Sequence, residues 1–207
     1  MNNQAKITQL QQLPGDFVLA HLVLDQAMEG DIIYFTDLEL RIGSLPTNDP
    51  TTRQLLCQSK QLPTIEIDHP VVVEQLPSTL FNLIIGHNNG IAAAINLAKR
   101  NRLQQPLVLL ATDNAFPFTP VPSSILVPNL PDGVIAASPL LDDWGIASRL
   151  ASIKPMPGCY AGDVFDLTAH LSATIDKDFN ICLAGSENFI NNDKLSVIKN
   201  RYQIVKL

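Results

Sequence analysis

The stretch from residue 78 to residue 112 constrains the fold more than any other part of this chain. Leu80 to Ile85 is a nearly unbroken apolar run, which is typical of a strand that is buried on both faces. After a turn at Gly86 to Gly90, apolar residues recur at helical spacing over residues 91–98. A second apolar run, Leu107 to Ala111, follows this helix. The pattern predicts a β-α-β unit with parallel strands.

The turn Gly86 to Gly90 lies between the carboxyl end of the first predicted strand and the amino end of the helix. In open α/β sheets, phosphate-bearing ligands bind at such turns because main-chain amides and the helix dipole both favour anions. His87, Asn88 and Asn89 are polar and could contact a ligand there. Alternatively, these side chains could bond the backbone of their own turn, as asparagine commonly does.

Polar residues also follow two other predicted strands, which should end at the same edge of the sheet. Ser186 and Glu187 could face the crevice at this edge, but they are equally typical of a helix cap followed by an acid in the first turn. The predicted binding residues are Gly86, His87, Asn88, Asn89, Gly90, Thr112, Asp113, Gly185, Ser186 and Glu187.

Composition and charge limit the possible partners. The 207 residues are 46% hydrophobic and 16% charged, so the chain can bury a substantial core. A net charge of −6 argues against a nucleic acid as partner, because phosphate binding needs a concentrated basic face. The sequence has no apolar run of about 18 residues that could span a membrane and no signal-peptide core. We therefore expect a cytoplasmic protein that does not enter a membrane.

No catalytic residue or metal site is predicted. Cys57, Cys159 and Cys182 lack metal-binding spacing, and Cys159 is the one that we expect to be exposed. No Ser-His-Asp order, Walker loop or HExxH motif is present. Asp142–Asp143 beside Trp144 could form an acid pair with a stacking ring, but an acidic helix start with a packed tryptophan is the simpler interpretation.

The residues before the β-α-β unit are predicted to form a small β-rich region over residues 1–77. Residues 1–12 are polar and should be a lead-in or a first helical turn. Thr51 to Lys60 is predicted to be a short helix capped by Asp49 or Thr51. The predicted strands are Phe17 to Leu24 and Asp31 to Thr36, which could form a hairpin, and Thr64 to Ile67 and Val71 to Glu74.

Residues 78–207 are predicted to form a Rossmann-like parallel sheet with helices on both faces, which makes the chain an α/β protein. Leu140 to Ser152 has apolar residues near helical spacing, interrupted by Gly145. The other predicted elements are strands at Gly133 to Ala137, Asn180 to Ala184 and Gln203 to Val205, and helices at Asp163 to Leu171 and Asp193 to Asn200.

The run IIGHNNGIAAAINLAKR resembles the strand, turn and helix that open the NAD(P)-binding domain of the ferredoxin reductase superfamily. It is most similar to the electron-transfer subunit of dihydroorotate dehydrogenase, whose turn reads Gly-Gly-Gly-x-Gly-[Ile/Val]-[Ala/Thr]-Pro. His87 and Asn88 stand where that family has glycines, and Ala93 replaces the proline. Asn88 can adopt the left-handed backbone that such a turn needs. The matching residues are Gly86, Gly90, Ile91 and Ala92.

The carboxyl-terminal half extends this resemblance. The run Gly162 to Leu167 is similar to the family's Gly-x-Val-Thr-Asp-Leu, and Ile181 to Ser186 is similar to the strand that ends in its Cys-Gly-Pro motif. Ala184 occupies the position of the cysteine that lies by the nicotinamide in family members. The chain also lacks the cysteine cluster that holds a two-iron, two-sulfur centre in the dehydrogenase subunits. We expect no iron–sulfur cluster.

In this superfamily a flavin-binding barrel precedes the nucleotide domain. Its signature is Arg-x-Tyr-[Ser/Thr], whose tyrosine stacks on the flavin ring. The nearest string here, Arg41-Ile42-Gly43-Ser44, lacks the tyrosine. Pro14 to Val18 is similar to the Pro-Gly-Gln-Phe-Val of the barrel. We expect a reduced, flavin-free version of this region and therefore no FAD.

The resemblance implies a reductase-like protein that binds NAD(P) or another adenine nucleotide at the 86–90 turn. A partner redox subunit or a second copy of the chain would be its partner. The alternative is a non-catalytic binding or interaction protein on the same scaffold. The departures at Asn88, Ala93 and Ala184 fall at positions that serve chemistry in the family, and they favour this alternative.

Overall fold

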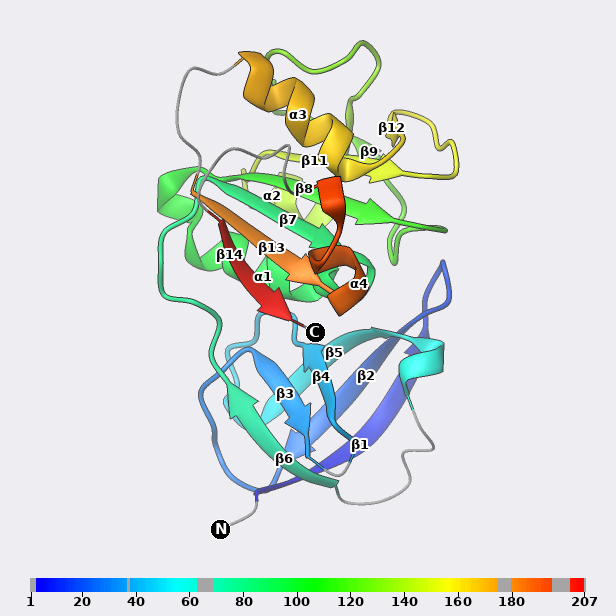
Figure 1. The fold of residues 1–207 in the computed structure, drawn as a ribbon. Helices are drawn as coiled ribbons and strands as arrows, with labels where there is room; N and C mark the ends of the chain where they lie inside the picture. Colours follow the sequence, from blue (N-terminus) through cyan, green and yellow to red (C-terminus); the bar gives the residue numbers. More distant parts are fainter. Residues whose placement is uncertain (1–2, 37, 63–68, 175–179, 195–201, 207) are drawn as a thin grey trace.

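The computed structural model describes residues 3–36, 38–62, 69–174, 180–194 and 202–206. Within these ranges the strands form two six-stranded sheets and a short two-stranded pair (Figure 1). The first part of the chain forms an antiparallel sheet, and the second part forms a parallel sheet covered by helices. This is the predicted α/β fold. The predicted division at residue 77 lies between β6, the last strand of the antiparallel sheet, and β7, the first strand of the parallel sheet. That this division is a domain boundary stays a prediction.

The parallel sheet has the strand order β12-β11-β8-β7-β13-β14. The chain passes from β7 outward to β12 and then returns to β13 on the other side of β7, so the winding direction reverses between β7 and β13. In doubly wound sheets this reversal opens a crevice at the carboxyl ends of the strands. The strands are β7 (Leu83–His87), β8 (Leu107–Thr112), β11 (Ser148–Ser152), β12 (Tyr160–Ala161), β13 (Ile181–Gly185) and β14 (Tyr202–Lys206).

Helices cover both faces of the parallel sheet (Figure 1). Successive strand residues point to opposite faces, so Ile84 packs in the same cluster as α1, whereas Leu83 and Ile85 pack in the cluster that contains α3. Every residue from Ile91 to Ala98 is buried, because α1 also contacts the antiparallel sheet. The helices are α1 (Ile91–Arg100), α2 (Pro139–Asp143), α3 (Val164–Thr174) and α4 (Glu187–Ile190).

The antiparallel sheet has the order β4-β3-β6-β1-β2-β5 and curls toward closure. An antiparallel bridge joins Ser44, just after β4, to Leu55 in the middle of β5, the other outer strand. Leu22, Ile33 and Leu55 are among the buried residues of its interior. The strands are β1 (Asn3–Gln12), β2 (Phe17–Leu24), β3 (Ile32–Phe35), β4 (Leu40–Gly43), β5 (Thr52–Gln58) and β6 (His69–Glu74).

Three predictions for the amino-terminal region are wrong. Residues 3–12 form the strand β1, which pairs with β2 and β6, instead of a lead-in. The strands β2 and β3 do not pair with each other in the described sheet. Residues 52–58 form β5 instead of a helix, because pairing with β2 buries Leu55 and Cys57 and overrides local propensity. Asp49 does accept a hydrogen bond from the Thr51 N–H, at 2.8 Å, but in a turn before the strand.

The second half follows the prediction more closely. The strands β7, β8 and β13 and the helices α1 and α3 are confirmed. The predicted helix from 140 to 152 is wrong in its second part, because α2 ends before Gly145, which has a φ of +71°, and β11 follows. The predicted strand from 133 to 137 is reduced to β10 (Ala136–Ala137), which pairs with β9 (Val121–Pro122). The predicted strand 64–67 and residues 195–200 of the last predicted helix lie outside the described residues.

One of the hydrophobic clusters joins the two sheets. Phe17, Ile32 and Leu56 of the antiparallel sheet belong to the same buried cluster as the residues of α1. The hairpin between β1 and β2 also reaches the loop that follows β8: a Cβ added at Gly15 would lie 2.2 Å from the Ala115 carbonyl oxygen. Both contacts fix the position of the antiparallel sheet against the parallel one. None of the described helices is long and apolar enough to span a membrane.

Candidate functional site

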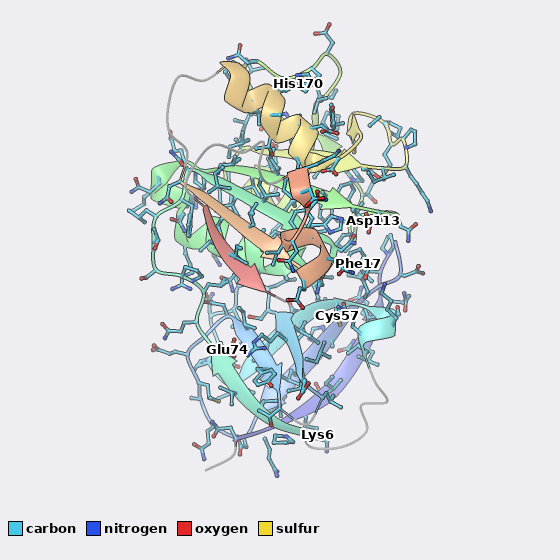
Figure 2. The ribbon with its side chains drawn as sticks, in the orientation of Figure 1. Lys6, Phe17, Cys57, Glu74, Asp113 and His170 are labelled. Carbon is cyan, nitrogen blue, oxygen red and sulfur yellow. The ribbon has the colours of Figure 1, made fainter. Side chains whose placement is uncertain are left out.

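A cavity of about 450 Å³ lies at the carboxyl edge of the parallel sheet, within the size range of small-molecule sites. Figure 2 shows Asp113 at this edge, on the side that faces the amino-terminal region. The cavity is lined by residues at or just after the ends of β7, β8, β11, β12 and β13, and by the end of β5 with the turn that follows it. They include His87, Asn88, Asn89, Thr112, Asp113, Ser186, Asn188, Phe189, Gln58, Lys60 and Gln61.

The turn between β7 and α1 has the geometry that its sequence predicts. Asn88 has a φ of +48°, the left-handed conformation that glycine provides in the family's motif. Gly86 and Gly90 do not line the cavity in the described structure. A Cβ at Gly90 would lie 2.0 Å from the Ala184 carbonyl oxygen, and one at Gly86 would lie 2.6 Å from the Ala94 Cβ. These two glycines therefore allow α1 to approach β7 and β13 closely.

Asp113 joins the polar side chains of the turn. Its Oδ1 lies 3.1 Å from His87 Nε2, and its Oδ2 accepts a hydrogen bond of 2.8 Å from Asn88 Nδ2. The Asp113 N–H donates to Asn88 Oδ1 at 3.3 Å. Thus Asn88 bonds the end of the neighbouring strand as well as shaping its own turn. The arrangement fixes the orientation of a carboxylate at the mouth of the cavity.

The Asp113 carboxyl is held in its ionised form. Partial burial by itself would raise its pKa, but the hydrogen bond from Asn88 and the proximity of His87 and Lys60 outweigh this effect and lower the pKa from its ordinary value. The side chain remains 60% exposed. It can therefore accept hydrogen bonds from the hydroxyl groups of a ligand.

His87 is fixed by stacking. Its ring lies 4.5 Å from the Phe189 ring at an interplanar angle of 12°, and Phe189 stacks in turn on Phe165 at 4.9 Å. Because aromatic contacts of this kind restrict ring rotation, Nε2 stays directed at Asp113. The buried Nδ1 of His87 has no hydrogen-bond partner among the described residues.

Asn89 is a second residue whose hydrogen bonding is incomplete at this site. Its side chain lines the cavity and the residue is only 4% exposed. Its buried Nδ2 has no partner within the described part of the chain. Leaving a buried donor unpaired costs about 1–3 kcal/mol. An acceptor atom of a ligand would remove this cost.

Of the other predicted residues, some line the cavity and others stabilise the segments around it. Thr112 is buried, and its hydroxyl donates to the Ala115 carbonyl at 3.2 Å, which stabilises the turn after β8. Gly185 packs against Phe189. Ser186 lines the cavity and occupies the N-cap position of α4, but its side chain makes no capping hydrogen bond there. Glu187 is in the first turn of α4 and outside the cavity lining of the described structure.

Sequence reasoning missed Gln58, Lys60 and Gln61. They lie at the end of β5 and in the 3-10 turn after it, and enter the site because the antiparallel sheet packs beside the parallel one. Nothing in the local sequence indicates this proximity, which depends on strand pairing between distant segments. Lys60 is exposed and lies close enough to Asp113 to influence its pKa.

Two other groups of candidates have structural roles. Asp142 accepts hydrogen bonds from the hydroxyls of Ser123, at 2.9 Å, and Ser124, at 2.8 Å, and so anchors the preceding loop. Trp144 packs on the core, and Lys99 Nζ lies 5.1 Å from its ring centroid. Cys159 is buried, contrary to the prediction, and burial raises the pKa of its thiol to about 11.

A larger cavity, of about 590 Å³, lies between the loops of the antiparallel sheet and the second half of α1. Its lining includes Arg100 and Asp31, which form an ion pair with each other. Arg53, also in the lining, donates to the backbone carbonyls of Asp49 and Thr52. These charges hold loops and helix together. The smaller cavity remains the better candidate because it lies where the parallel strands end.

No family model matches this sequence, and no curated protein matches it either. Solved structures do match. The Amycolatopsis cytochrome P450 reductase GcoB is 12% identical, with a TM-score of 0.67 over 100% of this chain and 69% of that chain. A Malassezia yamatoensis flavohemoglobin with bound FAD and heme is 11% identical, with a TM-score of 0.62 over 99% of this chain and 60% of that one.

The flavohem-like FAD/NAD-binding domain of the Vibrio cholerae nitric oxide dioxygenase is 9% identical, with a TM-score of 0.58 over 100% of this chain and 99% of that chain. These likenesses confirm a ferredoxin-reductase-like fold, and at such low identity they show the fold alone. Since FAD appears in the names of two of these proteins, the comparisons give no support to the expectation that FAD is absent.

Proposed function

We propose that this protein is reductase-like and binds an adenine nucleotide of the NAD(P) type in the cavity above the 86–90 turn. The likeness to a domain described as FAD/NAD-binding, which extends over the whole of this chain, supports the proposal. The turn motif favours the electron-transfer subunit of dihydroorotate dehydrogenase as the relative within this fold. This more specific relationship rests on the motif alone.

One observation carries the proposal: the unpaired Nδ2 of Asn89 lies in a cavity at the switch point of the sheet. Ligands of doubly wound proteins bind at this position. The amino end of α1 adjoins the same turn, and its dipole favours an anionic group. A phosphate or carbonyl oxygen would accept the free hydrogen bond of Asn89.

Asp113 and Lys60 indicate how the nucleotide would be recognised. In dinucleotide-binding folds, an acidic residue about 20 positions after the glycine turn accepts hydrogen bonds from the ribose hydroxyls. Asp113 follows β8 and presents an ionised carboxylate there. A 2′-phosphate would be repelled by this charge, so NAD should bind more tightly than NADP. Lys60, which lines the cavity from the turn after β5, supplies a positive charge for a phosphate.

The second candidate function is non-catalytic binding on the same scaffold. It is favoured by Ala184, which stands where the resemblance places a cysteine beside the nicotinamide and whose side chain offers no thiol. A partner redox subunit or a homodimer remains a proposal for both functions. Size-exclusion chromatography with light scattering on the purified chain tests the homodimer.

Thermal shift measurements with NADH, NADPH and AMP test the nucleotide proposal. A ligand that binds only the folded state stabilises it by about 2.7 kcal/mol at 100 times its Kd. We expect NADH to raise the melting temperature more than NADPH does. The proposal is wrong if none of the three nucleotides raises the melting temperature.

A pair of lysine variants locates the binding. Lys60→Ala should reduce the shift that NADH causes, because it removes a positive charge from the cavity wall. Lys6→Ala is the matched control, since Lys6 is also exposed but lies at the far end of the antiparallel sheet (Figure 2). Equal losses in both variants would indicate a general charge effect and would contradict the assigned site.

A further inference from the structure

Strand β4 and helix α1 touch directly at Gly43. A Cβ added at Gly43 would lie 3.0 Å from the backbone N of Ala93 and 3.2 Å from its Cβ. Both residues are buried. They are also the two positions at which the resemblance places a tyrosine, in the barrel signature, and a proline, in the glycine turn. Both residues are small, so the backbones of strand and helix lie close together.

The other residues of the signature are engaged with protein groups. Arg41 Nε donates to both carboxylate oxygens of Glu74, at 3.2 and 3.1 Å, and its guanidinium carbon lies 4.1 Å from the centroid of the Tyr34 ring. This paired, stacked geometry holds the guanidinium on the surface of the antiparallel sheet. Arg41 therefore serves as a cross-strand contact.

Ser44 belongs to a buried polar network that joins strand and helix. The residue is 1% exposed, and its hydroxyl donates to the Asp31 carbonyl at 2.9 Å. Its own carbonyl accepts a hydrogen bond of 3.2 Å from Asn96 Nδ2, which also donates to the Asp31 carboxylate at 3.1 Å. Arg100 completes the network through its ion pair with Asp31. These bonds fix α1 against the end of β4.

We propose that this protein holds no flavin, because α1 occupies the position beside β4 where the superfamily's tyrosine would stack on the ring. The residues present do not fit the group: a side chain at position 43 meets backbone, and Ser44 is committed to the network. The functional consequence of this inference rests on the proposed nucleotide site. A nucleotide in the cavity would then have no flavin beside it to receive a hydride, which favours the second candidate function, non-catalytic binding on the same scaffold.

The purified full chain tests the inference directly. It is expressed with added riboflavin, and its visible absorbance is recorded before and after denaturation. FAD and FMN are then titrated against it, with flavin fluorescence as the readout. We expect no flavin absorbance and no saturable change in fluorescence. A stoichiometric flavin, co-purified or titrated, would overturn the inference whatever the result with NADH.

The two proposals fail in different ways. NADH stabilisation without flavin binding supports both. An absence of stabilisation by any nucleotide, together with an absence of flavin binding, contradicts the proposed function but leaves the closed contact between β4 and α1 intact. Flavin binding with NADH stabilisation refutes only the inference.

A double-mutant cycle tests the contact itself in solution. Gly43→Ala should lower the melting temperature, because its new methyl group meets Ala93. Removing the facing methyl group with Ala93→Gly should lessen the effect, so the shift of the double variant should be smaller than the sum of the single shifts. Residues in contact are coupled in this way, whereas distant ones are additive. Additive shifts would contradict a contact between the side-chain positions 43 and 93.

Discussion

Gly90 shows how one residue can support the site by allowing close packing. It stands between the turn and the end of β13, where a Cβ would lie 2.0 Å from the Ala184 carbonyl oxygen. We expect Gly90→Ala to lower the free energy of unfolding by about 2–3 kcal/mol, because the backbones must separate to admit a methyl group. Urea unfolding followed by circular dichroism measures this. A loss below about 0.5 kcal/mol, the usual range for unconstrained surface positions, would contradict the packing described here.

Asp113 should make stability dependent on pH in the acid range. Its pKa is lowered in the folded protein, so its contribution is complete above the unfolded-state pKa of about 4 and is lost as pH falls through the lower folded-state value. The stability difference between the wild-type protein and Asp113→Asn should therefore shrink as pH falls below about 4. Melting temperatures across this range test it, with Asp143→Asn, an exposed acid on α2, as control. A stability difference that does not change with pH would contradict the lowered pKa of Asp113 in the folded protein.

At the level of residues, the sequence identified the polar groups but not how they pair. His87, Asn88 and Asp113 could be predicted as site candidates because each stands at the end of an expected strand. The contact of His87 with both Asp113 and Phe189 could not be predicted, since these residues come from three separate segments. Lys60 was missed for the same reason.

Among the elements, α1 connects the two sheets. Asn96 lies in its buried middle and donates to Asp31 and to the Ser44 carbonyl. Asn96→Leu would keep the size of the side chain. The Asp31 carboxylate and the Ser44 carbonyl would each lose one hydrogen bond. We expect a loss of about 1–3 kcal/mol in the free energy of unfolding. Chemical denaturation measures this, and an unchanged midpoint would show that the network contributes nothing.

The elements that the sequence predicted well are those whose burial pattern is uniform. Strand β13 and β7 before His87 contain only apolar residues and glycine, and α1 repeats small and apolar residues at helical spacing. A capping signal before Thr51 and helical spacing of apolar residues over 140–152 predict helices where β5 and β11 lie. Both strands also bury an arginine, Arg53 and Arg149. Arg149 donates to backbone carbonyls of Ser148 and Ile125, a compensation that only the folded structure provides.

For the molecule as a whole, the shared core predicts a single unfolding transition. Residues from both sheets pack in one buried cluster around α1, so neither sheet can lose its partner without exposing apolar surface. Differential scanning calorimetry should give one peak whose calorimetric and van't Hoff enthalpies agree. Two separate peaks would show that the sheets unfold independently.

The parts of the fold that depend on neighbouring segments of the chain could be predicted from the sequence. A β-α-β unit fixes the parallel sheet and the edge at which its strands end. The closure of the antiparallel sheet and its position beside the crevice depend on pairing between segments far apart in the chain, such as Ser44 and Leu55, which no local pattern records.

A nucleotide bound in the crevice at the carboxyl edge is the central proposal for this protein. Titrating NADH into isotope-labelled protein and following amide chemical shifts tests this claim residue by residue. We expect saturable shifts at Asn88, Asn89, Asp113 and Lys60, and none at Lys6 on the far strand. Shifts confined to residues outside the cavity, or none at all, would contradict it.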